Sequence, residues 1–305
     1  MPRKKHLVVL FLSVFLGSTV PIFLEYFTLY IDDAWTVNGF RYIVVFLVIF
    51  PVVISLFYKK KYTKRMWKVA LIPAFFNFAQ QVVWAWAPYY IDPGLMGFLI
   101  KSIVIWSMLG SFILFVDERY LLRSIKFWIG LTIAVAGTIG ISYFSGNISG
   151  ASSFLGVALV LCSSLFMASY GLAVKKYFNQ TNAIISFSII ASYTAVGIIS
   201  LMFIMGKPSV IFNLPIKVIA LIAASAFVGI TLGHILFYTS VRYVGVVVHY
   251  SVGLLSAFLT AIMSLLIYDD KLTLWQWLSG SLILIGGFII VVSKQNSKLK
   301  KDFVK

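Results

Sequence analysis

The chain has 305 residues, of which 61% are hydrophobic and only 11% are charged. A soluble domain of this length could not bury so much apolar surface, so the composition excludes a soluble globular protein and predicts a membrane protein. The net charge of +16 does not indicate a nucleic-acid partner, because the Lys and Arg residues lie in short segments between apolar runs. The single cysteine, Cys162, excludes a disulfide and a cysteine-rich metal site.

Ten apolar segments are long enough to cross a bilayer core of about 30 Å as a helix of about 20 residues. In chain order they cover residues 7–28, 35–57, 67–90, 94–116, 125–144, 154–174, 183–205, 216–240, 244–267 and 274–293. Short connections with turn-forming residues separate them. We therefore expect an all-α polytopic membrane protein with ten transmembrane helices.

Positive charges are distributed unevenly among the connections. If the N-terminus is cytoplasmic, all but five of the 25 Lys and Arg residues lie in cytoplasmic segments. The five exceptions are Lys207, Lys217 and Lys271 outside and Arg41 and Lys101 within spans. Because Lys and Arg accumulate on the cytoplasmic side of membrane proteins, both termini are predicted to be cytoplasmic. We expect a multi-pass protein of a cell membrane, namely the cytoplasmic membrane of a bacterium.

The sequence also repeats itself at a spacing of about 150 residues. The run 103–116 ends in Asp117-Glu118-Arg119, and the run 255–268 ends in Asp269-Asp270-Lys271. Two glycines seven positions apart follow each turn, first Gly130 and Gly137, then Gly280 and Gly287. With five spans in residues 1–146 and five in residues 147–305, the halves must be inverted in the membrane. Inverted repeats typically hold a substrate near the bilayer midplane.

Several motifs extend this interpretation. Asn38-Gly39-Phe40-Arg41-Tyr42 lies in the second span, and Asp270-Lys271-Leu272-Thr273-Leu274-Trp275-Gln276-Trp277 leads to Gly280 and Gly286-Gly287. Together with the two acidic–acidic–basic turns, these stretches resemble the drug/metabolite transporter superfamily, specifically its EamA-type ten-helix members. The resemblance covers nearly the whole chain. It implies the transport of a small organic compound without naming that compound.

Three charged residues lie well inside the predicted spans, where a charge at the centre costs about 2.5–3.5 kcal/mol on insertion scales. Lys101 is expected to bind a carboxylate or phosphate of the substrate or to lose its proton during the cycle; a structural ion pair or snorkelling is the alternative. Glu25 and Arg41 have similar depths in neighbouring helices, so we expect them to pair. Such a pair either only stabilises the fold or serves as an outer gate or proton-carrying group.

Polar and titratable residues complete the set of candidates. Asn77, Gln80, Gln81 and Trp84 share one face of the third span, which is expected to face a substrate cavity or another helix. The second half offers His234 with Tyr238 and His249 with Tyr250. Proton coupling through either histidine is one hypothesis, and a histidine that is only hydrogen-bonded inside the bundle is the other.

These features predict a secondary transporter that moves a small organic metabolite, amino-acid-like or otherwise anionic or zwitterionic, by alternating access. No ATP-binding motif occurs, so proton coupling, exchange or the substrate's own gradient is expected to supply the energy. Metalloprotease and hydrolase motifs are also missing from the sequence, which argues against an enzyme. The alternative is a lipid or lipid-phosphate flippase or scramblase in which Lys101 holds the phosphate. No cofactor or metal is expected; the predicted partners are a substrate, the lipid bilayer and, as a further hypothesis, a second copy of the chain.

Overall fold

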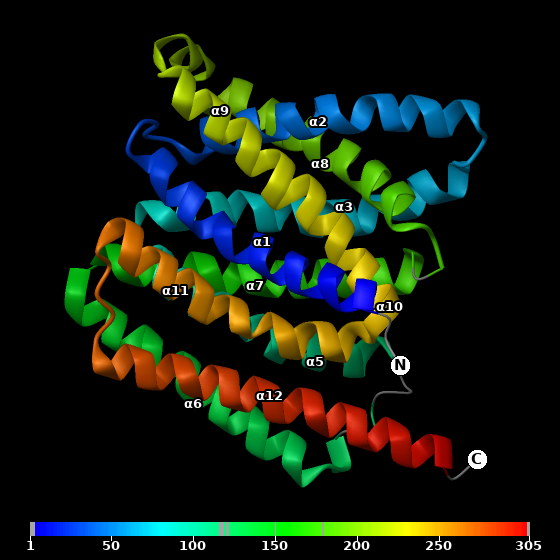
Figure 1. Cartoon of the computed structure of the whole chain (residues 1–305), viewed down its shortest axis with the longest axis vertical. Coiled ribbons are helices and arrows are strands. Elements are labelled where there is room, and N and C mark those ends of the chain that lie inside the picture. The colour runs from blue at the N-terminus through cyan, green and yellow to red at the C-terminus, as the bar shows by residue number, and fades with distance from the viewer. Residues whose placement is uncertain (1–3, 116–118, 120–121, 150, 179, 304–305) are drawn as a thin grey trace.

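The computed structural model describes residues 4–115, 119, 122–149, 151–178 and 180–303 (Figure 1). Within these ranges, side chains are described except at residues 4–6, 145–149, 151–153, 241–248, 250–251, 291 and 294–303. The described residues form helices and connections and contain no β-strand. The prediction of an all-α protein is therefore confirmed. Two residues of the first acidic turn, Asp117 and Glu118, lie outside the described residues.

In its described residues, the first half of the chain forms six α-helices. They are α1 (Lys4–Thr28), α2 (Ala34–Tyr58), α3 (Lys64–Trp86), α4 (Pro93–Leu99), α5 (Ile103–Leu114) and α6 (Ile125–Ser149). The 3-10 segments η1 (Ala87–Tyr89) and η2 (Ile100–Ser102) interrupt this series. Helix α6 continues to Ser149, three residues beyond the predicted end of the first half at residue 146.

The second half contains six more α-helices. They are α7 (Ala151–Phe178), α8 (Ala183–Met205), α9 (Ile216–Ser225), α10 (Gly233–Gly253), α11 (Leu255–Tyr268) and α12 (Leu274–Phe303). A 3-10 segment, η4 (Pro208–Asn213), precedes α9, and a π-helical segment, η5 (Ala226–Leu232), joins α9 to α10.

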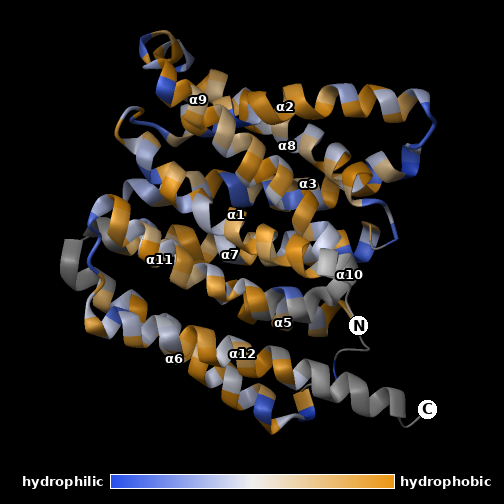
Figure 2. Ribbon diagram, viewed as in Figure 1, coloured by the Kyte–Doolittle hydropathy of each residue, from blue (hydrophilic) through white to orange (hydrophobic). Residues whose placement is uncertain are grey.

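In the described part of the chain, eight helical stretches are long and apolar enough to cross a membrane. They are Leu7–Thr28, Ala34–Tyr58, Lys64–Tyr89, Pro93–Leu114, Ile125–Phe144, Phe154–Phe178, Ala183–Met205 and Ile216–Ser240. Two shorter apolar helices, Leu255–Tyr268 and Leu274–Ile290, follow them. Eight of the predicted spans thus have full-length counterparts, and the last two have shorter ones. Figure 2 shows the resulting pattern, with hydrophobic helices and hydrophilic connections at the ends of the bundle.

Side-chain caps explain where several helices begin. The backbone N–H of Thr36 donates a hydrogen bond of 2.7 Å to the carboxylate of Asp33, which precedes α2. Thr63 accepts in the same way at the start of α3, and Asn182 accepts at the start of α8. Such caps satisfy amide groups that have no partner inside the helix.

The chain bends sharply within α10. Nδ1 of His249 and Oγ of Ser240 lie 3.0 Å apart, although the two residues are nine positions apart in the sequence. Nine residues of straight helix would separate their backbones by about 13 Å, because each residue adds about 1.5 Å. The bend lets α11 return through the bundle, where it packs against α1 and α4.

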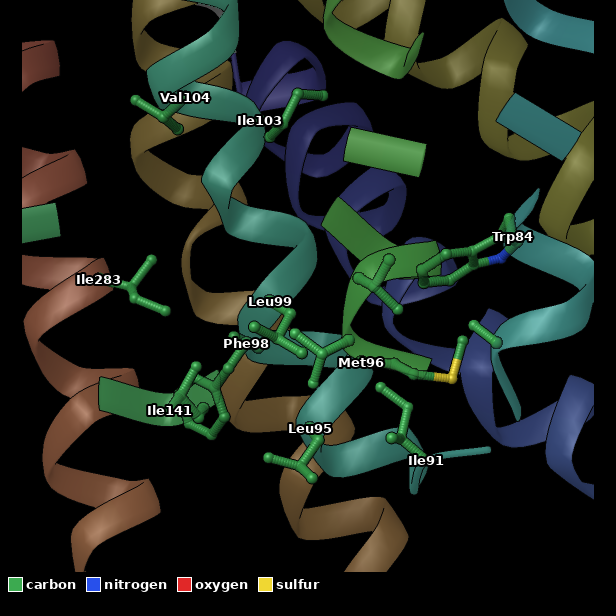
Figure 3. Close-up of a cluster of buried hydrophobic side chains, with 14 of the residues drawn as sticks. Trp84, Ile91, Leu95, Met96, Phe98, Leu99, Ile103, Val104, Ile141 and Ile283 are labelled. Carbon is green, nitrogen blue, oxygen red and sulfur yellow. The ribbon is translucent and has the colours of Figure 1, made fainter. Parts of the chain in front are cut away.

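Helix α4 lies at the centre of the larger apolar core. Met96, Phe98 and Leu99 are fully buried, and Figure 3 shows their side chains between Ile283 of α12 and Trp84 of α3. Packing of this kind positions the chain immediately before Lys101, which is two residues beyond the end of α4.

Helices α6 and α12 lie side by side along one edge of the bundle (Figure 1). Their close approach depends on glycine. A Cβ atom at Gly137 would lie 2.7 Å from the backbone oxygen of Ser279 and 2.7 Å from the backbone nitrogen of Ile283. One at Gly130 would lie 2.9 Å from the backbone oxygen of Gly286. Small residues thus let these two helices approach closely.

Replacement of Gly137 by leucine should therefore destabilise the protein. Overpacking typically costs about 1–3 kcal/mol, and here the nearest atoms belong to the backbone of α12 and have little freedom to move. We expect a clear decrease in the melting temperature of the purified protein in detergent. The matched control is Ile139→Leu on the exposed face of the same helix. Equal melting temperatures for the two variants would contradict the proposed packing.

Candidate functional site

A cavity of about 220 Å³ lies inside the bundle. Its walls come from α1, α2, α3, the α4–η2–α5 stretch, α7, the η5–α10 stretch and α11. Both predicted halves of the chain therefore contribute to it. Seven predicted site residues line this one cavity: Arg41, Gln80, Gln81, Trp84, Lys101, His234 and His249. No aspartate or glutamate is among the residues that line it.

Lys101 lies where the helix of the fourth span is interrupted. It belongs to η2, a short 3-10 segment between α4 and α5. Its Nζ donates a hydrogen bond of 2.5 Å to Oγ of Ser256, near the start of α11. Within the described part of the chain, Lys101 forms no ion pair, so the predicted structural salt bridge is absent there.

Arg41 is a buried cation in the wall formed by α2. Only 1% of its surface is exposed, and its Nε and Nη1 atoms have no hydrogen-bond partner. The guanidinium group lies against the π-helical segment, because a Cβ atom at Gly229 would be 3.8 Å from its Nη2 atom. The predicted pairing of Arg41 with Glu25 is wrong, since no ion pair joins these two described side chains.

Glu25 belongs to a different environment, at one end of the bundle. Its Oε2 atom is buried without a hydrogen-bond partner, and the nearby charges that act on it are those of Asp270 and Asp92. Similar depth in neighbouring helices was the reason for expecting the pair with Arg41. Depth alone does not determine the direction of a side chain around the helix axis, and the structure places Glu25 outside the cavity wall.

The polar face of α3 is divided between helix contacts and the cavity. The amide of Asn77 donates to Oγ1 of Thr194 at 3.0 Å, and Asn77 does not line the cavity. The amide of Gln80 donates to Oγ of Ser163 at 3.1 Å and also lines the cavity, as do Gln81 and Trp84. Both interpretations of this face thus apply: Asn77 contacts another helix, Gln81 and Trp84 line the cavity, and Gln80 does both.

His234 lines the cavity with a defined hydrogen bond. Its Nδ1 atom lies 2.8 Å from the backbone oxygen of Ile230, which can only accept. Nδ1 therefore carries the proton, and Nε2 of the neutral ring is left as an acceptor. Tyr238, one turn further, lies behind the wall and is hydrogen-bonded to the hydroxyl of Tyr170, which does line the cavity. Tyr250 lies in α10, but its side chain is outside the described part of the structure.

Comparisons with known proteins agree with this geometry. Residues 154–292 match the EamA-like transporter family. An uncharacterized transporter of Haemophilus influenzae (strain ATCC 51907 / DSM 11121 / KW20 / Rd) is 26% identical over 187 residues. That match covers 61% of this chain and 61% of the relative, so the chain spans about three fifths of the relative's length. Over residues 154–292, the second half of the chain is therefore similar to the EamA-like transporter family.

A similar fold occurs in a solved crystal structure. That structure has a TM-score of 0.60 to this chain, covers 96% of the chain and is covered over 98% of its own length. Since the two sequences are only 12% identical, this likeness shows the fold alone. With eight membrane-length apolar helices among its described residues, the chain is a multi-pass membrane protein with a fold that has been observed before.

Several residues of the transporter's cavity were not predicted from the sequence. Ser256 and Thr260 on α11 and Tyr170 on α7 line it, together with glycines from four helical segments. Neutral hydroxyls and glycines are common in membrane helices, so they carry no signal as strong as a buried charge. The π-helical turn in η5 is a feature often found at functional sites, and it is not visible as a sequence pattern either.

Replacement of Arg41 by methionine tests whether this cation has a structural partner. Replacing a buried ion pair by apolar side chains of similar size is often neutral or stabilising by about 1–4 kcal/mol, and a cation without a counterion has even less attraction to lose. We expect the melting temperature of Arg41→Met to be equal to or higher than that of the unmodified transporter. Arg65→Met, at an exposed position on α3, is the control. A decrease of several degrees in Arg41→Met alone would indicate a structural ion pair and contradict the assignment.

The acidic end of the bundle predicts a dependence of stability on pH. Burial raises the pKa of the Asp270 carboxyl, and the nearby charge of Asp269 raises it further, while the hydrogen bond from Ser264 lowers it. Partial burial and the charge of Asp270 likewise raise the pKa of Asp92. In each case the folded protein binds the proton more readily than the unfolded chain does. Stability should therefore increase as the pH falls through these raised pKa values and decrease as it rises through them.

Asp270→Asn should weaken this dependence, by less than about 1 kcal/mol because partly exposed carboxylates are screened by solvent. The measurement is the melting temperature in detergent from about pH 4 to about pH 8. This interval begins near the ordinary pKa of a carboxyl group and extends well above it. Asp32→Asn, at an exposed site, is the control. An unchanged pH profile in Asp270→Asn would show that this carboxyl does not contribute.

Proposed function

We propose that this protein is a secondary transporter that moves a small organic anion or zwitterion, such as an amino-acid-like compound, by alternating access. The observation that carries the proposal is the charge of the cavity. Arg41 and Lys101 both line it, and neither forms an ion pair with a described side chain. A cation held in an apolar bundle without a counterion is costly, and a bound anion would offset that cost.

The two cations differ in the way they can hold an anion. The guanidinium of Arg41 is planar and suited to a carboxylate that accepts two parallel hydrogen bonds. Lys101 offers a point charge on a flexible chain, with Oγ of Ser256 as its present neighbour. Gln80 and Gln81 add side-chain amides to the same cavity. Nε2 of His234 can accept a hydrogen bond from a hydroxyl or amine of the substrate. The set suits an organic acid that carries further polar groups.

Alternating access between two inverted five-helix halves is the mechanism we propose. It is supported by the positions at which two spans are interrupted. The α4–α5 stretch breaks at Lys101 and the α10–α11 stretch breaks beside Gly253, and these residues correspond in the sequence repeat. Both breaks lie in the cavity wall. Interrupted helices at corresponding positions are typical of sites between inverted repeats.

The proposed orientation, with both termini in the cytoplasm, has support from the arrangement of the ends. Helix α1 begins and α12 ends at the same end of the bundle, where the α2–α3 connection with its lysines also lies (Figures 1 and 2). The connection between α11 and α12 lies at the opposite end from the start of α6 (Figure 1). We further propose that an ion gradient, substrate exchange or the substrate's own gradient drives the cycle.

Lys101→Ala should abolish transport without preventing folding. The most direct test screens the purified protein against metabolites by thermal shift and then measures uptake of the stabilising compounds into proteoliposomes, with and without a pH gradient. We expect at least a tenfold loss of uptake, because one charge-assisted hydrogen bond contributes about 1.5–3 kcal/mol to binding. Ser107→Ala is the control, since Ser107 is hydrogen-bonded only within α5.

Two results would count against this function. Unchanged uptake kinetics in Lys101→Ala would remove Lys101 from the site. Movement of labelled phospholipid across the vesicle membrane, with no uptake of any soluble compound, would instead support the flippase alternative.

A further inference from the structure

The cavity glycines fall into two groups according to the space around them. Gly97 and Gly229 are needed for packing. A Cβ atom at Gly97 would lie 2.9 Å from Cβ of Thr260, and one at Gly229 would lie 2.8 Å from Cγ2 of Val20. Gly17 and Gly253 are different, because a Cβ atom at either would meet no described atom within 4 Å. No helix contact in the described residues therefore explains glycine at these two positions.

The backbone gives no reason for glycine there either. Neither residue has the positive φ that favours glycine over other residues. Gly17 lies in the interior of α1, and Gly253 is the last residue of α10. Glycine is less favourable than alanine inside a helix because it loses more conformational freedom on folding. Glycine at position 17 thus lowers helix stability without a visible gain in packing.

What the two glycines share is the empty space beside them. Both line the cavity, and they come from elements that pack against each other, α1 and α10 (Figure 1). Ser13 and Pro21 lie four positions to either side of Gly17 and line the same cavity, so this face of α1 is the wall. Gly253 occupies the position that corresponds to Lys101 in the sequence repeat. At this repeat position the first half of the chain therefore contributes the charge of Lys101, and the second half contributes the empty space beside Gly253.

The other residues that line the cavity indicate what kind of ligand could fill the empty space beside the two glycines. Trp84, Phe237, Met167 and Leu254 contribute apolar surface to the same cavity as the two cations. Its volume of about 220 Å³ exceeds the roughly 150 Å³ of an engineered protein cavity that binds benzene. A single aromatic ring with a short charged group would fit. The lining contains no carboxylate that could pair with an ammonium group.

We propose that Gly17 and Gly253 determine the size of the substrate: they leave the space for the apolar body of an organic acid whose carboxylate is held by Arg41 and Lys101. This inference rests on the proposed function and makes it narrower. It favours acids without a free ammonium group and limits the size of their apolar part. A methyl group at either glycine reduces the space without disturbing a helix contact.

The test compares Gly17→Ala and Gly253→Ala with Gly97→Ala, a cavity glycine that packing requires. The first measurement is the melting temperature without ligand. We expect Gly17→Ala and Gly253→Ala to melt at or above the temperature of the unmodified protein, because alanine favours a helix and meets no neighbour. Gly97→Ala should melt lower, because its new methyl group collides with Thr260.

The second measurement is the affinity for two carboxylic acids of different size, benzoate and 2-naphthoate, with benzylamine as a probe of opposite charge. In Gly17→Ala and Gly253→Ala, the affinity for benzoate should stay within about twofold of that of the unmodified protein. The affinity for 2-naphthoate should fall about tenfold or more, because the added methyl group leaves too little space for the second ring. Gly253→Val should extend the loss to benzoate.

The outcomes separate this inference from the proposed function. If the alanine variants keep the affinities of the unmodified protein for both acids, or lose both acids equally, Gly17 and Gly253 do not determine size. In that case the anion-binding function would still stand. If the unmodified protein binds neither acid, or binds benzylamine as well as benzoate, the anionic substrate class itself is wrong.

Discussion

Two cations inside an apolar bundle are the constraint on which the rest of the structure depends. Arg41 and Lys101 are enclosed by helices, and neither is compensated by a described carboxylate. Burial of an ion is costly unless the surroundings supply a counter-charge or hydrogen bonds. Here the surroundings supply mainly neutral hydroxyls, amides and an open cavity. This arrangement is the basis of our proposal that the cavity binds an anion, which would offset the cost of burying the two cations.

The fold creates this site by departing from regular helix geometry at three places. The 3-10 segment η2 carries Lys101, the π-helical segment η5 lies beside Arg41, and the helix breaks after Gly253, which also lines the cavity. Each irregular segment leaves backbone groups outside the regular helical pattern, which a membrane protein tolerates where the chain is buried in protein or lines a cavity. At the edge of the bundle, glycine allows α6 and α12 to pack closely.

Much of the fold could be predicted because the bilayer imposes one length on every span. Eight predicted spans have full-length helical counterparts, and the charged residues within spans identified both cations of the cavity. Side-chain direction could not be predicted in the same way. Glu25 and Arg41 are predicted from the sequence to have similar depths, but only Arg41 lines the cavity. Ser256, Gly17 and Gly253 have no charge or periodicity to distinguish them, and their importance depends on neighbours from distant parts of the chain. The bend between Ser240 and His249 likewise depends on tertiary contacts.

The central claim is that the cavity binds an organic anion through Arg41 and Lys101. The most direct measurement is an experimental structure of the purified transporter with 4-bromobenzoate, in which anomalous scattering locates the bromine. We predict a bromine peak inside the cavity, with the carboxylate within hydrogen-bonding distance of Arg41 or Lys101. A saturating concentration that leaves the cavity without bromine, or that places bromine only at the lipid-facing surface, would contradict the claim.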